Sequence, residues 1–167
     1  EEVLRVKNLT GPGFKNVSFS LRKGEILALT GLAGSGASEL MQALFGVLSQ
    51  DSGCIEVNNK MVSGSIRTFM KNSISMLPAN RKENSVIPDL TIMENFVTAE
   101  HALSSKKQFI KPLEDKEKYL KEKNRLKIKA DNEENPISSL SGGNQQKVFL
   151  ARWLNTQSEV LLLDNPT

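Results

Sequence analysis

The chain has little that would staple it covalently or hold it in a bilayer. Its 167 residues include a single cysteine, Cys54, which excludes an internal disulfide framework and fits a reducing compartment. No apolar run approaches the roughly 20 residues that a membrane-spanning helix needs. The formal net charge of +3 is a mild excess that does not by itself indicate a nucleic-acid partner. Within these limits, a chain with 38% apolar residues is long enough for one domain with a hydrophobic core.

The order of sequence patterns predicts an α/β fold. The runs that favour β-strands lie at residues 3–6, 17–21, 26–29, 55–62, 74–77 and 160–163. A helix is expected after the third run, because Leu40, Ala43 and Leu44 recur on one helical face before Gly46 ends the pattern. The last run, Val160 to Leu163, is of the buried type found in parallel sheets.

The stretch from Leu90 to Lys129 is charged, helical in pattern and poor in β-branched residues. Thr91 and Glu94 have the spacing of a capping box that begins a helix. The stretch therefore predicts a helical insert in an α/β core. We expect a β subdomain and core over 1–90, a helical subdomain over 91–138, and a final helix and strand over 139–167. A solvated charge ladder along one helix is expected from Glu114, Lys116, Glu117, Lys118 and Lys121.

A glycine-rich segment follows the run 26–29 and opens the first expected helix. Its spacing fits the phosphate-loop pattern G-x-x-x-x-G-K-[ST] except at the lysine position, where Ala37 stands. Backbone N–H groups of such a loop face inward and bind phosphate, and Ser38 stands where a hydroxyl would bind Mg²⁺. The alternative is a strand-to-helix turn that needs glycine only for tight packing. The expected nucleotide-binding residues here are Gly31, Leu32, Ala33, Gly34, Ser35, Gly36, Ala37 and Ser38.

A second phosphate-type segment, Leu140-Ser141-Gly142-Gly143, lies directly before an apolar helical pattern. A serine hydroxyl and uncovered backbone N–H groups would gather at this helix N-terminus, whose partial positive charge suits a phosphate. A chance Ser-Gly-Gly turn is the alternative. Gln145, in the first turn of the helix, either adjusts the phosphate contact or only favours the helix start.

A carboxylate follows the last apolar run. Asp164, at the carboxyl end of a buried strand, is suited to hold Mg²⁺ directly or through water, although it could also simply begin a turn. The next residue, Asn165, stands where a carboxylate would activate water; a neutral amide orients water but is a very poor base. The predicted metal ligands are therefore Ser38 and Asp164, and the catalytic position holds an inactive Asn165.

These segments, in this order, resemble the ATPase domain of ABC transporters: a Walker A loop at 31–38, a signature at 140–143 and a Walker B strand ending at Asp164. Finer details resemble the second ATPase half of ribose-, xylose- and galactose-type sugar importers, which often lacks the P-loop lysine. Those details are the turn at 11–13 ahead of 22–27, the pair Gly31-Leu32, and the run 140–147. The resemblance implies a P-loop NTPase (RecA-like) core with an antiparallel β subdomain and an inserted α-helical subdomain.

The resemblance also implies ATP and Mg²⁺ as cofactors, with two domains that sandwich two ATP molecules head to tail. Ser141 and Gly143 would then grip the γ-phosphate of an ATP held mainly by the other domain. The implied partners are a second ABC ATP-binding domain in the same polypeptide, transmembrane permease subunits and, indirectly, an extracytoplasmic solute-binding protein, with no nucleic acid. The implied function is to couple ATP to carbohydrate uptake at the cytoplasmic face of the cell membrane.

Several positions depart from the family pattern. Besides Ala37 and Asn165, Ala79 stands where a glutamine or glutamate would contact the metal. Phe14 is the nearest aromatic residue for stacking on adenine, but core packing explains it better. His101, the only histidine, precedes the signature, so it is expected on a helix surface rather than as the family's switch histidine. Because electrostatic groups supply most of phosphoryl-transfer catalysis, we expect no hydrolysis at this domain's own site.

The chain begins without methionine and stops at Thr167, so a fragment of a longer protein is expected. Related ATPases place a later strand between the Walker A and Walker B strands, so the core sheet is expected to be incomplete. Two alternative functions stay open: a non-transport ABC-type ATPase acting on nucleic acid or the ribosome, and a non-functional remnant. The region 91–129 lacks the heptad seam of the coiled coil that the first alternative usually carries.

Overall fold

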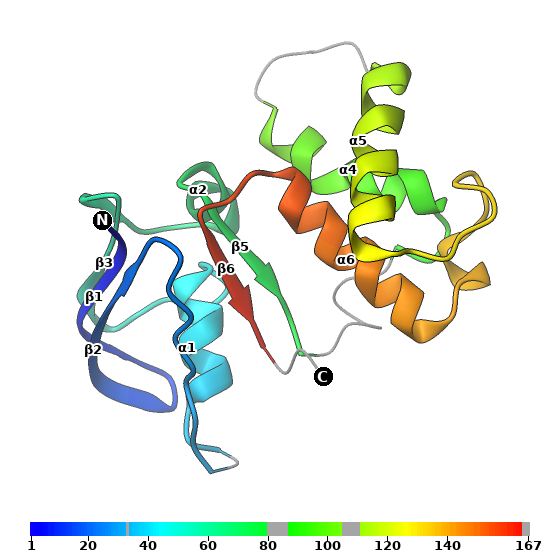
Figure 1. Cartoon of the computed structure of the whole chain (residues 1–167). Coiled ribbons are helices and arrows are strands. Elements are labelled where there is room, and N and C mark those ends of the chain that lie inside the picture. The colour runs from blue at the N-terminus through cyan, green and yellow to red at the C-terminus, as the bar shows by residue number, and fades with distance from the viewer. Residues whose placement is uncertain (33, 80–86, 105–110, 165–167) are drawn as a thin grey trace. The chain divides into compact units, whose positions relative to one another are not determined.

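The computed structural model describes residues 1–32, 34–79, 87–104 and 111–164. The described residues form two compact units (Figure 1). The first, called the sheet unit, comprises residues 1–76 and 158–164. The second, called the helical unit, comprises the described residues of 77–157.

An antiparallel sheet of order β2-β1-β3-β4 forms one part of the sheet unit. Its strands are β1 (Glu2–Gly11), β2 (Phe14–Arg22), β3 (Ser52–Val57) and β4 (Lys60–Val62). Leu4 pairs with Val57 and Val6 with Ile55, and all four side chains are buried. Alternation along the strands therefore places one apolar face inward. The strands predicted at 3–6, 17–21 and 55–62 are confirmed.

The other part of the sheet unit carries the predicted parallel strands. β5 (Ile74–Leu77) and β6 (Val160–Leu163) are neighbours, and their arrows point the same way in Figure 1. Two helices accompany them, α1 (Ala37–Leu44) and α2 (Ile66–Lys71). Leu40, Ala43 and Leu44 of α1 are buried, as their spacing predicts, and α1 contacts β1 and β2.

The strand predicted at 26–29 is absent, so that prediction is wrong. Residues 25–30 have no regular secondary structure, and the side chain of Ile26 is 96% exposed. A β-type run becomes a strand only when a neighbouring strand takes up its backbone N–H and C=O groups. None of the described strands pairs with this run, and β5 and β6 form a separate sheet of two strands. The incomplete core sheet expected from the sequence stays a prediction.

The helical unit is built on α4 (Ile92–Leu103), α5 (Pro112–Leu126), the short 3₁₀ helix η1 (Ile137–Ser139) and α6 (Gly142–Asn155). Its core joins all three α-helices, and Phe96 meets Tyr119 edge to face with ring centroids 5.5 Å apart. Phe149 is buried in this core and Trp153 packs against it. No helix among the described residues combines the length and the apolar character needed to cross a membrane.

A local signal sets the start of α4. The Thr91 hydroxyl accepts a hydrogen bond from the Glu94 N–H at 3.1 Å, and the Glu94 carboxylate accepts one from the Thr91 N–H at 2.8 Å, which confirms the capping box.

The charge ladder predicted along α5 is wrong in its partners. Lys116 pairs with Glu133 at 2.6 Å and Lys118 with Glu100 at 2.5 Å, so these ion pairs join different segments rather than successive turns.

Candidate nucleotide-binding site

The glycine-rich loop enters α1 through left-handed backbone that suits glycine. Gly34 has φ +79° and Gly36 has φ +86°, values that other residues adopt only with strain. A Cβ on Gly36 would collide with the carbonyl oxygen of Gly13, whereas a Cβ on Gly34 would meet nothing within 4 Å. Gly36 is therefore required for close packing, as the alternative interpretation holds. Gly34 instead shapes a stretch of loop that faces open space.

The start of α1 leaves backbone donors available. Its N-cap residue, Gly36, offers no side-chain cap, so the first N–H groups of the helix can turn to water or to an anion. The Ser35 N–H is different, because it already donates to the Leu32 carbonyl oxygen at 2.9 Å. Ala37 opens the helix and brings no charge. Ala33, also predicted as part of this loop, lies outside the described residues.

Ser38 and Asp164 meet although 126 positions separate them in the chain. The Ser38 hydroxyl donates to the Asp164 carboxylate at 3.1 Å, and Asp164 is only 9% exposed. The loop helix α1 and the end of β6 thus bring together the two residues that the sequence predicts as metal ligands. Among the described residues no group of three or more acidic, histidine or cysteine side chains gathers for a metal.

The chemistry of this pair fits Mg²⁺. Magnesium prefers hard oxygen ligands, which a hydroxyl and a carboxylate supply. The Ser38 hydroxyl and the Asp164 carboxylate, whose oxygens are 3.1 Å apart, are the two groups that would hold the ion. Magnesium in phosphate-transfer sites commonly has one or two protein ligands and takes the rest from water and phosphate. These two residues would therefore supply some of the ligands of the ion, and water and a bound phosphate would supply the others.

The signature segment belongs to the helical unit. Ser141 is the N-cap residue of α6, and its side chain and the two following glycines are exposed. A Cβ added at Gly142 or Gly143 would meet nothing within 4 Å. The backbone at this helix end is therefore open to an incoming phosphate. The Ser141 hydroxyl accepts a hydrogen bond from the Asn144 side-chain amide at 3.0 Å.

The side chains of Gln145 and Asn144 form hydrogen bonds that support the start of α6. The Gln145 side chain donates to the Leu140 carbonyl oxygen at 2.9 Å, and the Asn144 side chain accepts from the Lys129 N–H at 2.9 Å. Gln145 thus holds the residue before Ser141 in place. This geometry favours the interpretation in which Gln145 supports the helix start.

The remaining predicted positions are less informative. Phe14 is buried in the sheet unit, in agreement with core packing. Ala79 is exposed and brings no polar group. Asn165, predicted at the catalytic position, lies outside the described residues.

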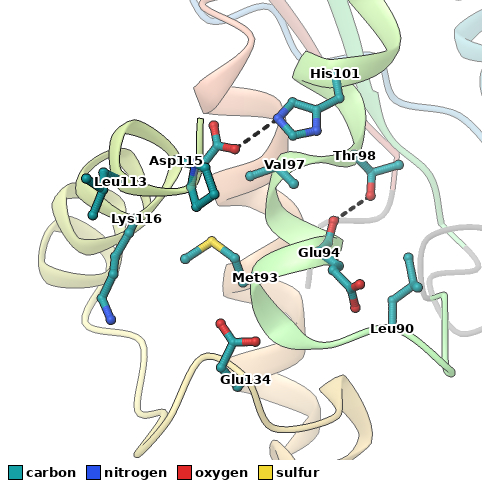
Figure 2. A pocket seen from close by; sticks show the side chains of 11 residues that line it. Leu90, Met93, Glu94, Val97, Thr98, His101, Leu113, Asp115, Lys116 and Glu134 are labelled. Atoms are coloured by element: carbon teal, nitrogen blue, oxygen red, sulfur yellow. Dashed lines mark hydrogen bonds and ion pairs between the residues drawn. The ribbon is translucent and has the colours of Figure 1, made fainter. Parts of the chain in front are cut away.

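A cavity of about 510 Å³ lies in the helical unit, and the sequence did not reveal it. Figure 2 shows the side chains of α4 and α5 around it. Apolar side chains of Met93, Val97 and Leu113 line it together with carboxylates and the Lys116 ammonium. His101 lies on α4 with its side chain 36% exposed, as expected for a helix surface, and it also lines this cavity and bonds to the Asp115 carboxylate at 3.1 Å.

This cavity does not suit a nucleotide. Three carboxylates line it, those of Glu94, Asp115 and Glu134, and Lys116 at its edge is already paired with Glu133. A triphosphate would meet an excess of like charge there. The features suited to binding phosphate lie instead at the start of α1 and at the start of α6.

Comparison with known proteins agrees with these features. The family model described as "ABC transporter" matches residues 14–167. A ribose import ATP-binding protein of Lactococcus lactis subsp. cremoris is 41% identical over all of this chain and 34% of its own length. An import ATP-binding protein of Hahella chejuensis, named for ribose, galactose and methyl galactoside, is 42% identical over 99% of this chain and 33% of its own length. The chain thus spans about a third of the length of these curated relatives.

Solved structures share the fold. An ATP-binding cassette of an ABC transporter in its ADP conformation matches with a TM-score of 0.81 and 26% identity, over 99% of this chain and 69% of that chain. A dimeric ATP-binding cassette bound to ADP and phosphate matches with a TM-score of 0.80 over 98% of this chain and 74% of that one. At 22% identity the second likeness supports the fold alone. The sequence, the folded phosphate-loop elements and these matches agree that the chain belongs to the ATP-binding domains of the ABC transporter family.

Proposed function

We propose that this chain is the degenerate ATP-binding half of an ABC importer for sugars. Its signature contacts the γ-phosphate of an ATP that a second ATP-binding domain anchors, while its own phosphate loop holds nucleotide weakly and does not hydrolyse it. The observation that carries this proposal is the exposed start of α6. Ser141, Gly142 and Gly143 are exposed there, and the Gln145 side chain holds the preceding residue by a hydrogen bond. An intact signature beside a phosphate loop without lysine is useful only if the signature serves another site.

This domain's own nucleotide site keeps residues suited to binding ATP but lacks those needed to hydrolyse it. Ser38 and Asp164 fit a magnesium ion that would accompany the β- and γ-phosphates. Ala37 removes the ammonium that would neutralise those phosphates, and Asn165 removes the base. Losing both a positioned charge and a general base lowers phosphoryl transfer by several orders of magnitude.

The partners follow from this arrangement. We infer a second ABC ATP-binding domain in the same polypeptide, because the named relatives are about three times as long as this chain. Transmembrane permease subunits and, indirectly, an extracytoplasmic solute-binding protein complete the importer at the cytoplasmic face of the membrane. The relatives are named for ribose, galactose and arabinose, which supports a pentose or hexose as the solute class. Lys116 and Lys118 are engaged in ion pairs, so they offer no support for a nucleic-acid partner.

Asp164→Asn tests the proposed magnesium site. Without Mg²⁺ the carboxylate repels the triphosphate, so the substitution is expected to tighten ATP binding; with Mg²⁺ it removes a ligand and is expected to weaken binding about 10-fold. Calorimetric titration of the folded chain with ATP, in Mg²⁺ and in a chelator, measures both effects. Asp51→Asn, at an exposed carboxylate of the same unit, is the matched control and should change neither. If Asp164→Asn weakens binding equally in both buffers, the residue has only a structural role.

A further inference from the structure

The cavity of about 510 Å³ in the helical unit has no part in the proposed function. Its lining comes from Leu90 and α4, from the start of α5, and from Glu134 in the segment before η1 (Figure 2). Small-molecule sites in proteins are usually cavities of roughly 300–1,000 Å³. The cavity is therefore large enough for a small organic ligand.

One part of the lining is apolar. Met93 and Val97 are four residues apart on α4, so they lie on the same face of that helix. Leu113, at the start of α5, also lines the cavity, and its side chain is 80% exposed. An apolar side chain left in water gains free energy when a ligand covers it. These three side chains therefore suit the hydrocarbon part of a ligand.

Another part of the lining is acidic. Glu94, Asp115 and Glu134 each contribute a carboxylate. Among the described residues that line the cavity, Lys116 is the only lysine or arginine, and its ammonium already pairs with the Glu133 carboxylate at 2.6 Å. The lining therefore has more carboxylates than cations to neutralise them.

Two of these carboxylates can still accept hydrogen bonds. Asp115 is only 7% exposed, and its side chain makes one hydrogen bond to the described residues, through Oδ2 to His101 at 3.1 Å. Its Oδ1 is therefore able to accept from a further donor. No hydrogen bond or salt bridge joins the Glu134 carboxylate to the described residues. A protonated His101 would offset one of the three negative charges and leave the cavity acidic.

The two kinds of lining together indicate the chemistry of the ligand. The carboxylates repel an anion. A neutral hydrocarbon would cover the carboxylates without offering them hydrogen bonds, which costs free energy. A metal ion would leave the apolar side chains uncovered, and no group of three metal-binding side chains lies among the described residues. A small cation with an apolar body matches both parts of the lining.

We propose that this cavity binds a small amphipathic cation, which is an ammonium or guanidinium group on a short hydrocarbon body. The cationic group donates hydrogen bonds to the carboxylates of Asp115 and Glu134. The hydrocarbon body packs on Met93, Val97 and Leu113. This site shares no residue with the starts of α1 and α6, so the proposal does not depend on the proposed function.

The test titrates the full-length protein with n-hexylammonium chloride and follows the methyl signal of Met93 by NMR, after isotopic labelling of the methionine methyl groups. The signal that disappears in Met93→Leu identifies this residue. We expect a saturable shift. The uncharged n-hexanol has the same hydrocarbon chain and should bind about 10-fold more weakly, because it lacks the charge-assisted hydrogen bonds. Sodium hexanoate and methylammonium chloride should give no saturable shift over the same concentrations.

Substitutions separate the two parts of the site. Glu134→Gln and Asp115→Asn should each weaken n-hexylammonium binding about 5- to 10-fold and leave n-hexanol binding within about twofold. Leu113→Ser should weaken the binding of both probes about fivefold, because it removes apolar contact area. Glu117→Gln is the matched control, since Glu117 is an exposed carboxylate of α5 outside the lining, and it should change neither affinity.

Three results would overturn the proposal: equal binding of n-hexylammonium and hexanoate, a shift that never saturates, or unchanged amine binding in Glu134→Gln. Should Asp115→Asn fail to fold, Glu134→Gln and Leu113→Ser still decide the outcome. Saturable amine binding should also persist when the protein is assembled with its partner proteins. Its loss there would show that a protein segment occupies the cavity, which contradicts the assignment to a small ligand.

Discussion

Ser141→Arg in the full-length protein is expected to lower the steady-state ATPase rate by about 100-fold or more, since donors aimed at the transferring phosphate supply that much of the rate. Ser141 is the exposed N-cap residue of α6, and the backbone beside it is open at Gly142 and Gly143. A long side chain there fills the space that the γ-phosphate would occupy. Phosphate release from saturating MgATP measures the effect.

Ser138→Arg is the matched control for this prediction. Ser138 is an exposed serine three residues earlier, in η1. Its substitution by arginine introduces the same bulk and charge outside the start of α6. Its ATPase rate should stay within about twofold of the unmodified protein, as surface substitutions usually do. Equal rates for the Ser141 and Ser138 variants would show that the signature has no role in turnover.

The second large effect is a gain. Ala37→Lys restores an ammonium at the start of α1, and a hydrogen bond to a charged phosphate contributes about 1.5–3 kcal/mol, so MgATP should bind about 10- to 100-fold more tightly. Adding Asn165→Glu supplies a general base, which contributes about 100- to 10,000-fold to the rate. The double variant is therefore expected to hydrolyse ATP at its own site, while Ala37→Lys alone binds without turnover.

Ala37→Met controls for side-chain length without charge, and it should not tighten binding. Nucleotide affinity is read by calorimetry, and single-turnover phosphate release measures the chemistry. If the unmodified protein already binds MgATP at its own loop as tightly as the Ala37→Lys variant, the missing lysine is not the defect that we infer.

Local signals made much of the fold predictable. The capping box at Thr91 and Glu94, the buried face of α1 and the alternation in β1 and β3 depend on residues near one another in sequence. The Ser38–Asp164 pair was also predictable, although its members are distant, because both motifs have a fixed place relative to a strand end and a helix start. In each case backbone geometry leaves few alternatives.

The errors have a common cause, which is that partners distant in sequence decide the outcome. Residues 26–29 have strand composition, but no described neighbour pairs with them. Lys116 and Lys118 have helical spacing, yet Glu133 and Glu100 lie nearer to them than the carboxylates of their own helix.

The sequence contains one indication of the hydrogen bonds between Asn95 and Arg152. Asn95 interrupts the apolar face that Ile92, Phe96 and Ala99 form on α4. A polar residue on a buried helical face needs partners. Sequence alone could not say that those partners are Arg152 and the backbone of 87–91, because that requires the packing of α4 on α6.

The central claim is that the ATP undergoing turnover is anchored outside residues 1–167 and is only gripped by the signature within them. Trapping the full-length protein during turnover with vanadate and a photoreactive, radiolabelled adenine nucleotide, followed by cleavage and mapping of the labelled peptide, locates the anchoring domain. The account predicts that the label is recovered outside residues 1–167. Label recovered mainly within residues 1–167 would contradict it.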